Sequence, residues 1–167
     1  MKIYHDVLPK LLLKECVDEV LELMKERCWG SSMIRWHPTL KKGVVGDSVH
    51  TYVPEKTKNK IIESIKEYFP QDSTYDMHYF VWLPNSGISE HNDGEHSYGA
   101  TIYLNRTWDK NMGGIFLWDD GDPVVMKAIS PKFNMMVSND CHQNHMVTPV
   151  SPLATGPRFT IQIWVDS

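Results

Sequence analysis

Two stretches in the first half of the chain carry apolar residues at helical spacing. In residues 9–28 an apolar residue recurs at every fourth position, as in a helix that buries one face. The recurring positions are Leu12, Cys16, Val20, Met24 and Cys28. Residues 54–69 show a second such face through Ile61 and Ile65, with Pro70 just beyond its end. We expect the first helix to pack on a sheet; a helix that pairs with a second copy, giving a homodimer, is the open alternative.

From Thr74 onward the pattern changes to short apolar runs separated by turn residues such as Asp-Asp-Gly-Asp-Pro at 119–123. Strands are predicted over residues 75–83, 98–104, 114–118, 123–129, 133–138, 145–149 and 158–165. Residues 32–36 and 49–53 are further candidate strands. Many short strands after two helices predict a mainly β fold with supporting α-helices, a jelly roll of two facing sheets. No repeat or linker interrupts the pattern, so we expect one domain over residues 1–167.

Three residues in the second half have the spacing of a metal site. His91 and Asp93 are two positions apart, so in an extended segment their side chains point to the same side. His145, 52 residues after Asp93, is the third candidate ligand. Two imidazoles and one carboxylate on one side of a metal suit non-haem Fe(II) that activates oxygen. Arg158, 13 residues after His145, offers a planar fork for a carboxylate co-substrate beside the metal.

Further motifs surround these four residues in a fixed order. The segment Tyr-Leu-Asn-Arg-Thr-Trp-Asp at 103–109 is followed by Gly-Gly-Ile-Phe-Leu at 113–117. His145 is followed by valine and proline at 147 and 149, and Arg158 by isoleucine and tryptophan at 161 and 164. Together they resemble the Fe(II)- and 2-oxoglutarate-dependent oxygenases, on their prolyl hydroxylase branch. The resemblance covers about residues 74 to 167 and implies a double-stranded β-helix, the same architecture that the strand pattern predicts.

The resemblance implies roles for particular residues. His91, Asp93 and His145 would be the iron ligands, and Arg158 would hold the C5 carboxylate of 2-oxoglutarate. The alternative histidine for the third position is His142, which lacks the Val-x-Pro-Val continuation that follows His145. An i, i+5 spacing after His91 argues against histidine 96 as a ligand, because it fits no extended geometry.

Three more residues are expected beside the co-substrate. Tyr103 matches the family tyrosine whose hydroxyl shares the C5 carboxylate. Trp82 stands where these hydroxylases often have a tyrosine, so it supplies an indole N–H in place of a hydroxyl. Thr160, two residues beyond Arg158, is a further candidate for this pocket. Trp164 matches a family tryptophan near the site; a core position and a substrate-pocket position are both open.

By this resemblance the protein is a dioxygenase that uses Fe(II), 2-oxoglutarate and dioxygen, with ascorbate as a candidate reductant. The expected substrate is a prolyl residue of a peptide or protein. Two alternatives stay open: a hydroxylase of a free amino acid or other small metabolite, and a catalytically silent metal-binding jelly-roll module. Residues 37–48, with Gly43 and Gly46, are expected to be a mobile loop that orders over the substrate; a plain connection is the alternative.

Composition and charge indicate which partners and which location are expected for the protein. The net charge of −4 gives no general attraction to nucleic acid or to an anionic membrane surface, so neither is an expected partner. No apolar run is long enough to span a membrane, and the N-terminus lacks the features of a signal peptide. Three cysteines without a C-x-x-C pair fit neither a disulfide framework nor a zinc site. A reducing cytoplasm is the expected location.

Overall fold

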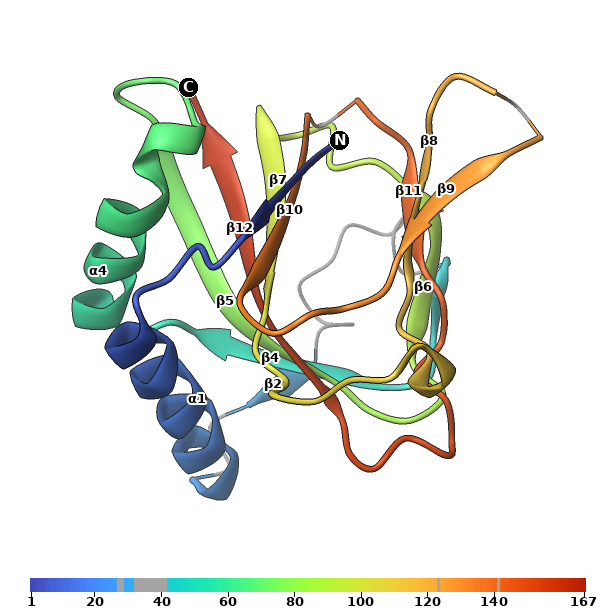
Figure 1. Ribbon diagram of the computed structural model, residues 1–167, viewed down its shortest axis with the longest axis horizontal. Helices are drawn as coiled ribbons and strands as arrows, with labels where there is room; N and C mark the ends of the chain where they lie inside the picture. The colour runs from blue at the N-terminus through green and yellow to red at the C-terminus, as the bar shows by residue number, and fades with distance from the viewer. Residues whose placement is uncertain (27–28, 32–41, 123, 141) are drawn as a thin grey trace.

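Two antiparallel sheets face each other in this protein (Figure 1). The structure is a computed structural model that describes residues 1–26, 29–31, 42–122, 124–140 and 142–167. The seven-stranded sheet has the order β1 (Lys2–His5), β10 (Met135–Asp140), β7 (Tyr98–Tyr103), β12 (Arg158–Asp166), β5 (Thr74–Trp82), β4 (Ser48–Tyr52) and β2 (Gly30–Ser31). The five-stranded sheet has the order β3 (Val44–Val45), β6 (Gly87–His91), β11 (His145–Val147), β8 (Phe116–Asp119) and β9 (Met126–Ile129).

Two helices cover the outer face of the larger sheet, while the smaller sheet covers its inner face (Figure 1). Helix α1 (Lys10–Lys25) and helix α4 (Glu55–Ile65) confirm the two predicted helices, and a 3₁₀ turn, η1 (Lys66–Tyr68), continues α4. A second 3₁₀ turn, η2 (Lys110–Met112), precedes β8. The expected last position of the first helix, Cys28, lies outside the described residues. Neither described helix is long and apolar enough to cross a membrane.

Alternation along β5 and β12 divides the interior into two apolar clusters. Met77 and Tyr79 on β5 pack with Ile161 and Ile163 on β12 beneath the helices. The residues between them point the other way, because successive strand residues face opposite sides of a sheet. These other side chains, including Phe80, help fill the space between the two sheets. The larger sheet is therefore buried on one face by helices and on the other by the smaller sheet.

The mainly β jelly-roll fold with supporting helices is confirmed, and each of the seven strands predicted after Thr74 is present within a few residues of its expected bounds. The candidate strand at 49–53 corresponds to β4, whereas residues 32–36 lie outside the described residues. Four strands were not predicted: β1, β2, β3 and β6. Strand β6 has only one large apolar residue, Ile88, and gains its stability from pairing with β3 and β11.

Part of the segment expected to be a mobile loop is a strand. Residues 37–41 lie outside the described residues, but Val44 and Val45 form β3 and pair with Ile88 and Gly87 of β6. Gly46 then turns the chain with φ +68°, where a β-carbon would lie 2.6 Å from the carbonyl oxygen of residue 85. The expectation of a loop was wrong for residues 44–45, because the two valines complete an edge of the smaller sheet, and for Ser48, which begins β4 and pairs with Trp82.

Candidate active site

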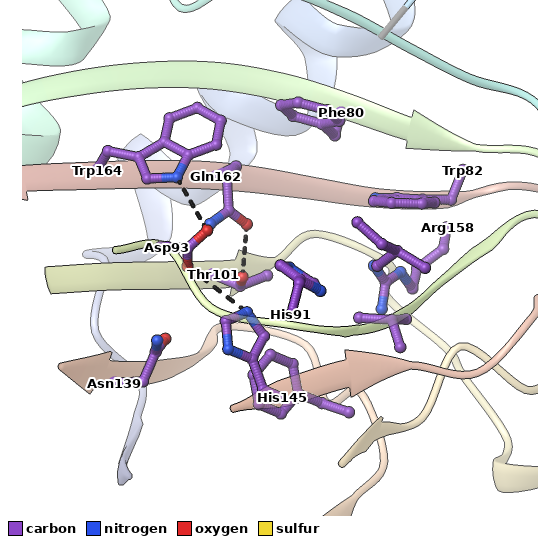
Figure 2. Close-up of a pocket in the computed structure, with 13 residues that line it drawn as sticks. Phe80, Trp82, His91, Asp93, Thr101, Asn139, His145, Arg158, Gln162 and Trp164 are labelled. Carbon is purple, nitrogen blue, oxygen red and sulfur yellow. Dashed lines mark hydrogen bonds and ion pairs between the residues drawn. The ribbon is translucent and has the colours of Figure 1, made fainter. Parts of the chain in front are cut away.

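The structure brings together the three residues that the sequence spacing singled out. His91 ends β6, and His145 begins β11 directly opposite it in the antiparallel pair. The two imidazole rings lie with centroids 4.3 Å apart. Asp93 follows β6, and its Oδ2 is 3.5 Å from Nε2 of His145. One potential ligand atom from each of the three residues lies within 4.8 Å of the others, so the group is the size of a metal site (Figure 2).

Backbone carbonyl groups orient both imidazoles. Nδ1 of His91 is 2.8 Å from the carbonyl oxygen of Ser89, and Nδ1 of His145 is 3.0 Å from that of Gln143. A carbonyl oxygen only accepts hydrogen bonds, so each Nδ1 carries the proton and each Nε2 keeps its lone pair. Burial, and then the neighbouring His145, lower the pKa of His91 below its ordinary value, which favours the neutral ring. Neutral imidazoles with fixed tautomers are the form that binds metal.

The described residues provide a hydrogen bond to only one of the two carboxylate oxygens of Asp93. Trp164 approaches Oδ1 through its indole N–H at 3.5 Å. Oδ2 is buried and has no hydrogen-bond partner in the described part of the chain. A buried anionic oxygen without a partner is costly, and a bound cation removes that cost. The donor set of two imidazoles and one carboxylate fits Fe(II).

Arg158 begins β12 and is 2% exposed. Its Nη1 donates to the carbonyl oxygen of Gly114 at 2.9 Å, whereas its Nε has no partner among the described residues. Burial lowers the pKa of Arg158 to about 10, which still leaves the guanidinium charged at neutral pH. No carboxylate in the described ranges forms an ion pair with it. A buried cation without a counter-charge calls for an anionic ligand.

The other three predicted co-substrate residues lie around this guanidinium. Trp82 is opposite Arg158 on β5, and its ring centroid is 5.3 Å from the guanidinium carbon. The ring of Tyr103, on β7, is 5.8 Å away. The hydroxyl groups of Tyr103 and Thr160, which are cross-strand neighbours, are both buried and unpartnered among the described residues. Burial raises the pKa of Tyr103 to about 12, so its hydroxyl keeps a proton to donate to a carboxylate.

One pocket is lined both by the group of His91, Asp93 and His145 and by Arg158. Arg158 and Trp82 lie on one side of the two histidines, and Trp164, Gln162, Thr101 and Asn139 lie on the other (Figure 2). The remaining lining residues are apolar: Phe80, Ile88, Phe116 and Val147. Except for Trp164, the sequence reasoning gave none of the polar residues on that other side and none of these apolar residues a place in the pocket. Two of them, Phe80 and Gln162, stand two positions from Trp82 and Thr160 on the same strands, so strand alternation was the signal that could have found them.

The geometry agrees with a comparison of the sequence with known families. Residues 64–166, more than half of the chain, match the model of the 2OG-Fe(II) oxygenase superfamily. The chain belongs to this superfamily. Its members use Fe(II), 2-oxoglutarate and dioxygen. In this 2OG-Fe(II) oxygenase the Asp93 oxygen and the two Nε2 atoms fit the metal. The guanidinium of Arg158, which forms no ion pair with the described residues, fits a carboxylate of 2-oxoglutarate.

Solved structures support the fold at low sequence identity. A prolyl-4-hydroxylase from Pseudomonas putida aligns with a TM-score of 0.73 and 16% identity over 99% of this chain and 91% of its own. A Trichoplax adhaerens prolyl hydroxylase, in complex with a hypoxia inducible factor peptide fragment, aligns at 0.77 and 15% over 99% and 82%. The viral collagen prolyl hydroxylase of Paramecium Bursaria Chlorella virus-1 aligns at 0.68 and 15% over 98% and 94%. A search of curated proteins finds no match.

Two other histidines near the site are not part of the ligand group. His142 is exposed in the turn before β11, and its backbone N–H donates to Asp140 Oδ1. His96 pairs instead with Asp166, whose Oδ2 is 3.2 Å from its Nδ1. The group of three therefore contains the two histidines at 91 and 145 that the sequence analysis preferred.

Proposed function

We propose that this oxygenase holds Fe(II) through His91, Asp93 and His145, and 2-oxoglutarate through Arg158. The assignment rests on a single pocket in which two buried polar groups lack partners among the described residues. At one end is a buried carboxylate oxygen that accepts no hydrogen bond from the described residues, and at the other is a buried guanidinium for which these residues provide no counter-charge. A metal cation and a dicarboxylate complete both ends at once. The whole chain would then serve as one catalytic domain.

The chain's own residues have positioning roles in this proposal. Arg158 and the hydroxyl of Tyr103 hold the distal carboxylate of 2-oxoglutarate, with Thr160 beside them and Trp82 stacked on the guanidinium. The carbonyl of Gly114 keeps the guanidinium in place. When bound, iron and 2-oxoglutarate supply the oxidising chemistry by which dioxygen hydroxylates a C–H bond. The apolar lining beside the histidines limits the access of water to that chemistry.

We infer that the substrate is a prolyl residue in a peptide or protein. The support is the fold shared with several prolyl hydroxylases, one of which was solved with a peptide fragment. The pocket also supports it, because the ring of Trp164 lies at the edge of the pocket, within reach of Asp93 through its indole N–H. A flat apolar ring of this kind suits contact with a pyrrolidine ring.

Succinate formation tests the proposal directly. The protein, loaded with Fe(II) and ascorbate, is incubated with 2-oxoglutarate and either capped proline-containing peptides, free amino acids or no added substrate. We expect peptide-dependent succinate and a mass increase of one oxygen on the peptide. Succinate that depends on a free amino acid would instead indicate the small-metabolite alternative. Absence of succinate together with tight Mn(II) binding would indicate a silent metal-binding module.

A further inference from the structure

The end of the pocket opposite Arg158 is polar but uncharged. It contains Thr101 on β7, Asn139 on β10 and Gln162 on β12 (Figure 2). Gln162 stands four residues from Arg158 on the same face of β12, a separation of about 13 Å along a strand. The candidate metal ligands lie between these two ends. This end would therefore be on the far side of a bound metal from the 2-oxoglutarate carboxylate, which leaves it free for the substrate.

A cross-strand hydrogen bond orients the side-chain amide of Gln162. Thr101 lies directly opposite Gln162, and its hydroxyl donates to Gln162 Oε1 at 2.7 Å. Because the oxygen is taken by Thr101, the two N–H groups on Nε2 remain available as donors. Nε2 makes no hydrogen bond with the described residues, in which the Gln162 side chain is bonded through Oε1. Gln162 is half-buried, so its amide faces the pocket with its donors unused.

The charges around the pocket restrict what can bind there. Of the thirteen lining residues only four are ionisable: the three candidate ligands and Arg158. A free amino acid carries an ammonium and a carboxylate, and neither would find a counter-charge at the Gln162 end. An amide carbonyl needs only a neutral donor, which Nε2 supplies. Asn139 adds a neutral acceptor, because its Nδ2 donates to the carbonyl oxygen of residue 140 at 3.1 Å, whereas its Oδ1 accepts no hydrogen bond from the described residues.

We propose that Gln162 is a specificity-determining residue that donates a hydrogen bond to an uncharged carbonyl group of the substrate, and that Thr101 is the positioning residue that holds its amide. The oxygenase thereby selects a prolyl group embedded in a peptide over free proline. This inference rests on the proposed function above. It goes further by naming the residues that recognise the substrate, Gln162 and Thr101, and the substrate group that they recognise, a carbonyl.

Three variants test the inference. Gln162→Met keeps the side-chain length but removes the donors, Thr101→Val removes the hydroxyl at nearly constant volume, and Thr101→Ser retains it. For each, the KM and kcat for a capped peptide of the form acetyl-Ala-Ala-Pro-Ala-Ala-amide are measured from succinate formation, with free L-proline as the comparison. The affinity of the Mn(II)-loaded protein for 2-oxoglutarate, measured by calorimetry, serves as the control for folding and for co-substrate binding.

We expect Gln162→Met to raise the KM for the capped peptide by roughly 5- to 30-fold, the range for a lost donor to a buried carbonyl. Thr101→Val should raise it by about 3-fold, since the amide keeps its donors but loses its orientation, and Thr101→Ser should restore the original KM. The affinity for 2-oxoglutarate should stay within 2-fold, about the limit of a negligible effect. An unchanged KM in Gln162→Met, or a preference for free L-proline, overturns the inference but leaves the oxygenase function intact. If neither compound supports succinate formation, the prolyl hydroxylase proposal fails, and this inference with it.

Discussion

Gly99 leaves the space that the carboxylate of Asp93 occupies. A β-carbon at residue 99 would lie 2.6 Å from Asp93 Oδ2, closer than a real contact allows. Gly99→Ala should therefore displace the carboxylate and weaken Mn(II) binding by roughly 10-fold or more, as loss of support for a ligand typically does. Calorimetric titration with Mn(II) measures the effect. Gly156→Ala is the matched control, since a β-carbon there meets nothing within 4 Å; equal affinities in both variants would show that Asp93 does not bind the metal.

The third ligand can be distinguished from the nearest alternative histidine by a pair of variants. His145→Ala removes an Nε2 that lies 3.5 Å from Asp93 Oδ2, and we expect Mn(II) affinity to fall by more than about 100-fold. His142→Ala removes an exposed ring outside the ligand group and should leave the affinity unchanged. The same titration reads both. Loss of metal in the His142 variant alone would contradict the proposed ligand set.

Arg158 should account for much of the affinity for 2-oxoglutarate. Its guanidinium is buried and has no counter-charge among the residues that the structure describes, so Arg158→Ala should weaken 2-oxoglutarate binding to the Mn(II)-loaded protein by roughly 10- to 100-fold. Arg158→Lys should recover only part, because an ammonium lacks the planar fork. The exposed Arg106, which lies over the ring of Phe133, provides a control in Arg106→Ala. Unchanged binding in Arg158→Ala would remove the main support for this co-substrate site.

Cys16 should be chemically silent in the folded protein. It is fully buried, and that burial raises the pKa of its thiol from 9.0 to about 12. At pH 9 about half of the unfolded chains carry a thiolate at this position while the folded chain keeps its proton, so alkylation should require unfolding. Iodoacetamide labelling at pH 9, followed by mass spectrometry of the Cys16 peptide, should show modification only after denaturant is added. Rapid labelling of the native protein would mean that α1 does not stay packed on the sheet.

The sequence predicted the parts of this fold that depend on local pattern. The four-residue recurrence from Leu12 onward located α1, and turn residues located the strands of the second half. It also singled out His91 and Asp93, because their relation depends on an i, i+2 spacing within one segment. Strand β6, which carries His91, was missed because its five residues hold one large apolar side chain and its stability comes from its neighbours.

The sequence alone did not predict which residues lie opposite each other on neighbouring strands. Gly99 is opposite Trp164 and beneath Asp93, and Thr101 is opposite Gln162, only because β7 and β12 pair in one particular register. A single-residue shift would turn every one of these side chains to the other face of the sheet. The register follows from the packing of both apolar clusters together, which no local pattern in the chain expresses.

Gly114 lies against Arg158, the proposed 2-oxoglutarate residue. A substitution at Gly114 should therefore act in two ways, through backbone strain and through displacement of the Arg158 side chain. The φ of Gly114 is +62°, and a β-carbon there would lie 2.9 Å from Cδ of Arg158. Gly114→Ala should thus push the guanidinium away from its place and weaken 2-oxoglutarate binding, while Mn(II) affinity is retained. Gly121 also has a positive φ, +90°, but none of the described residues lies within 4 Å of a β-carbon there. Both alanine variants should lower the free energy of unfolding by about 1 kcal/mol or somewhat more, the cost of a left-handed conformation for a residue with a β-carbon. Only Gly114→Ala should lose affinity for 2-oxoglutarate; a similar loss in Gly121→Ala would attribute the effect to general destabilisation and not to the contact with Arg158.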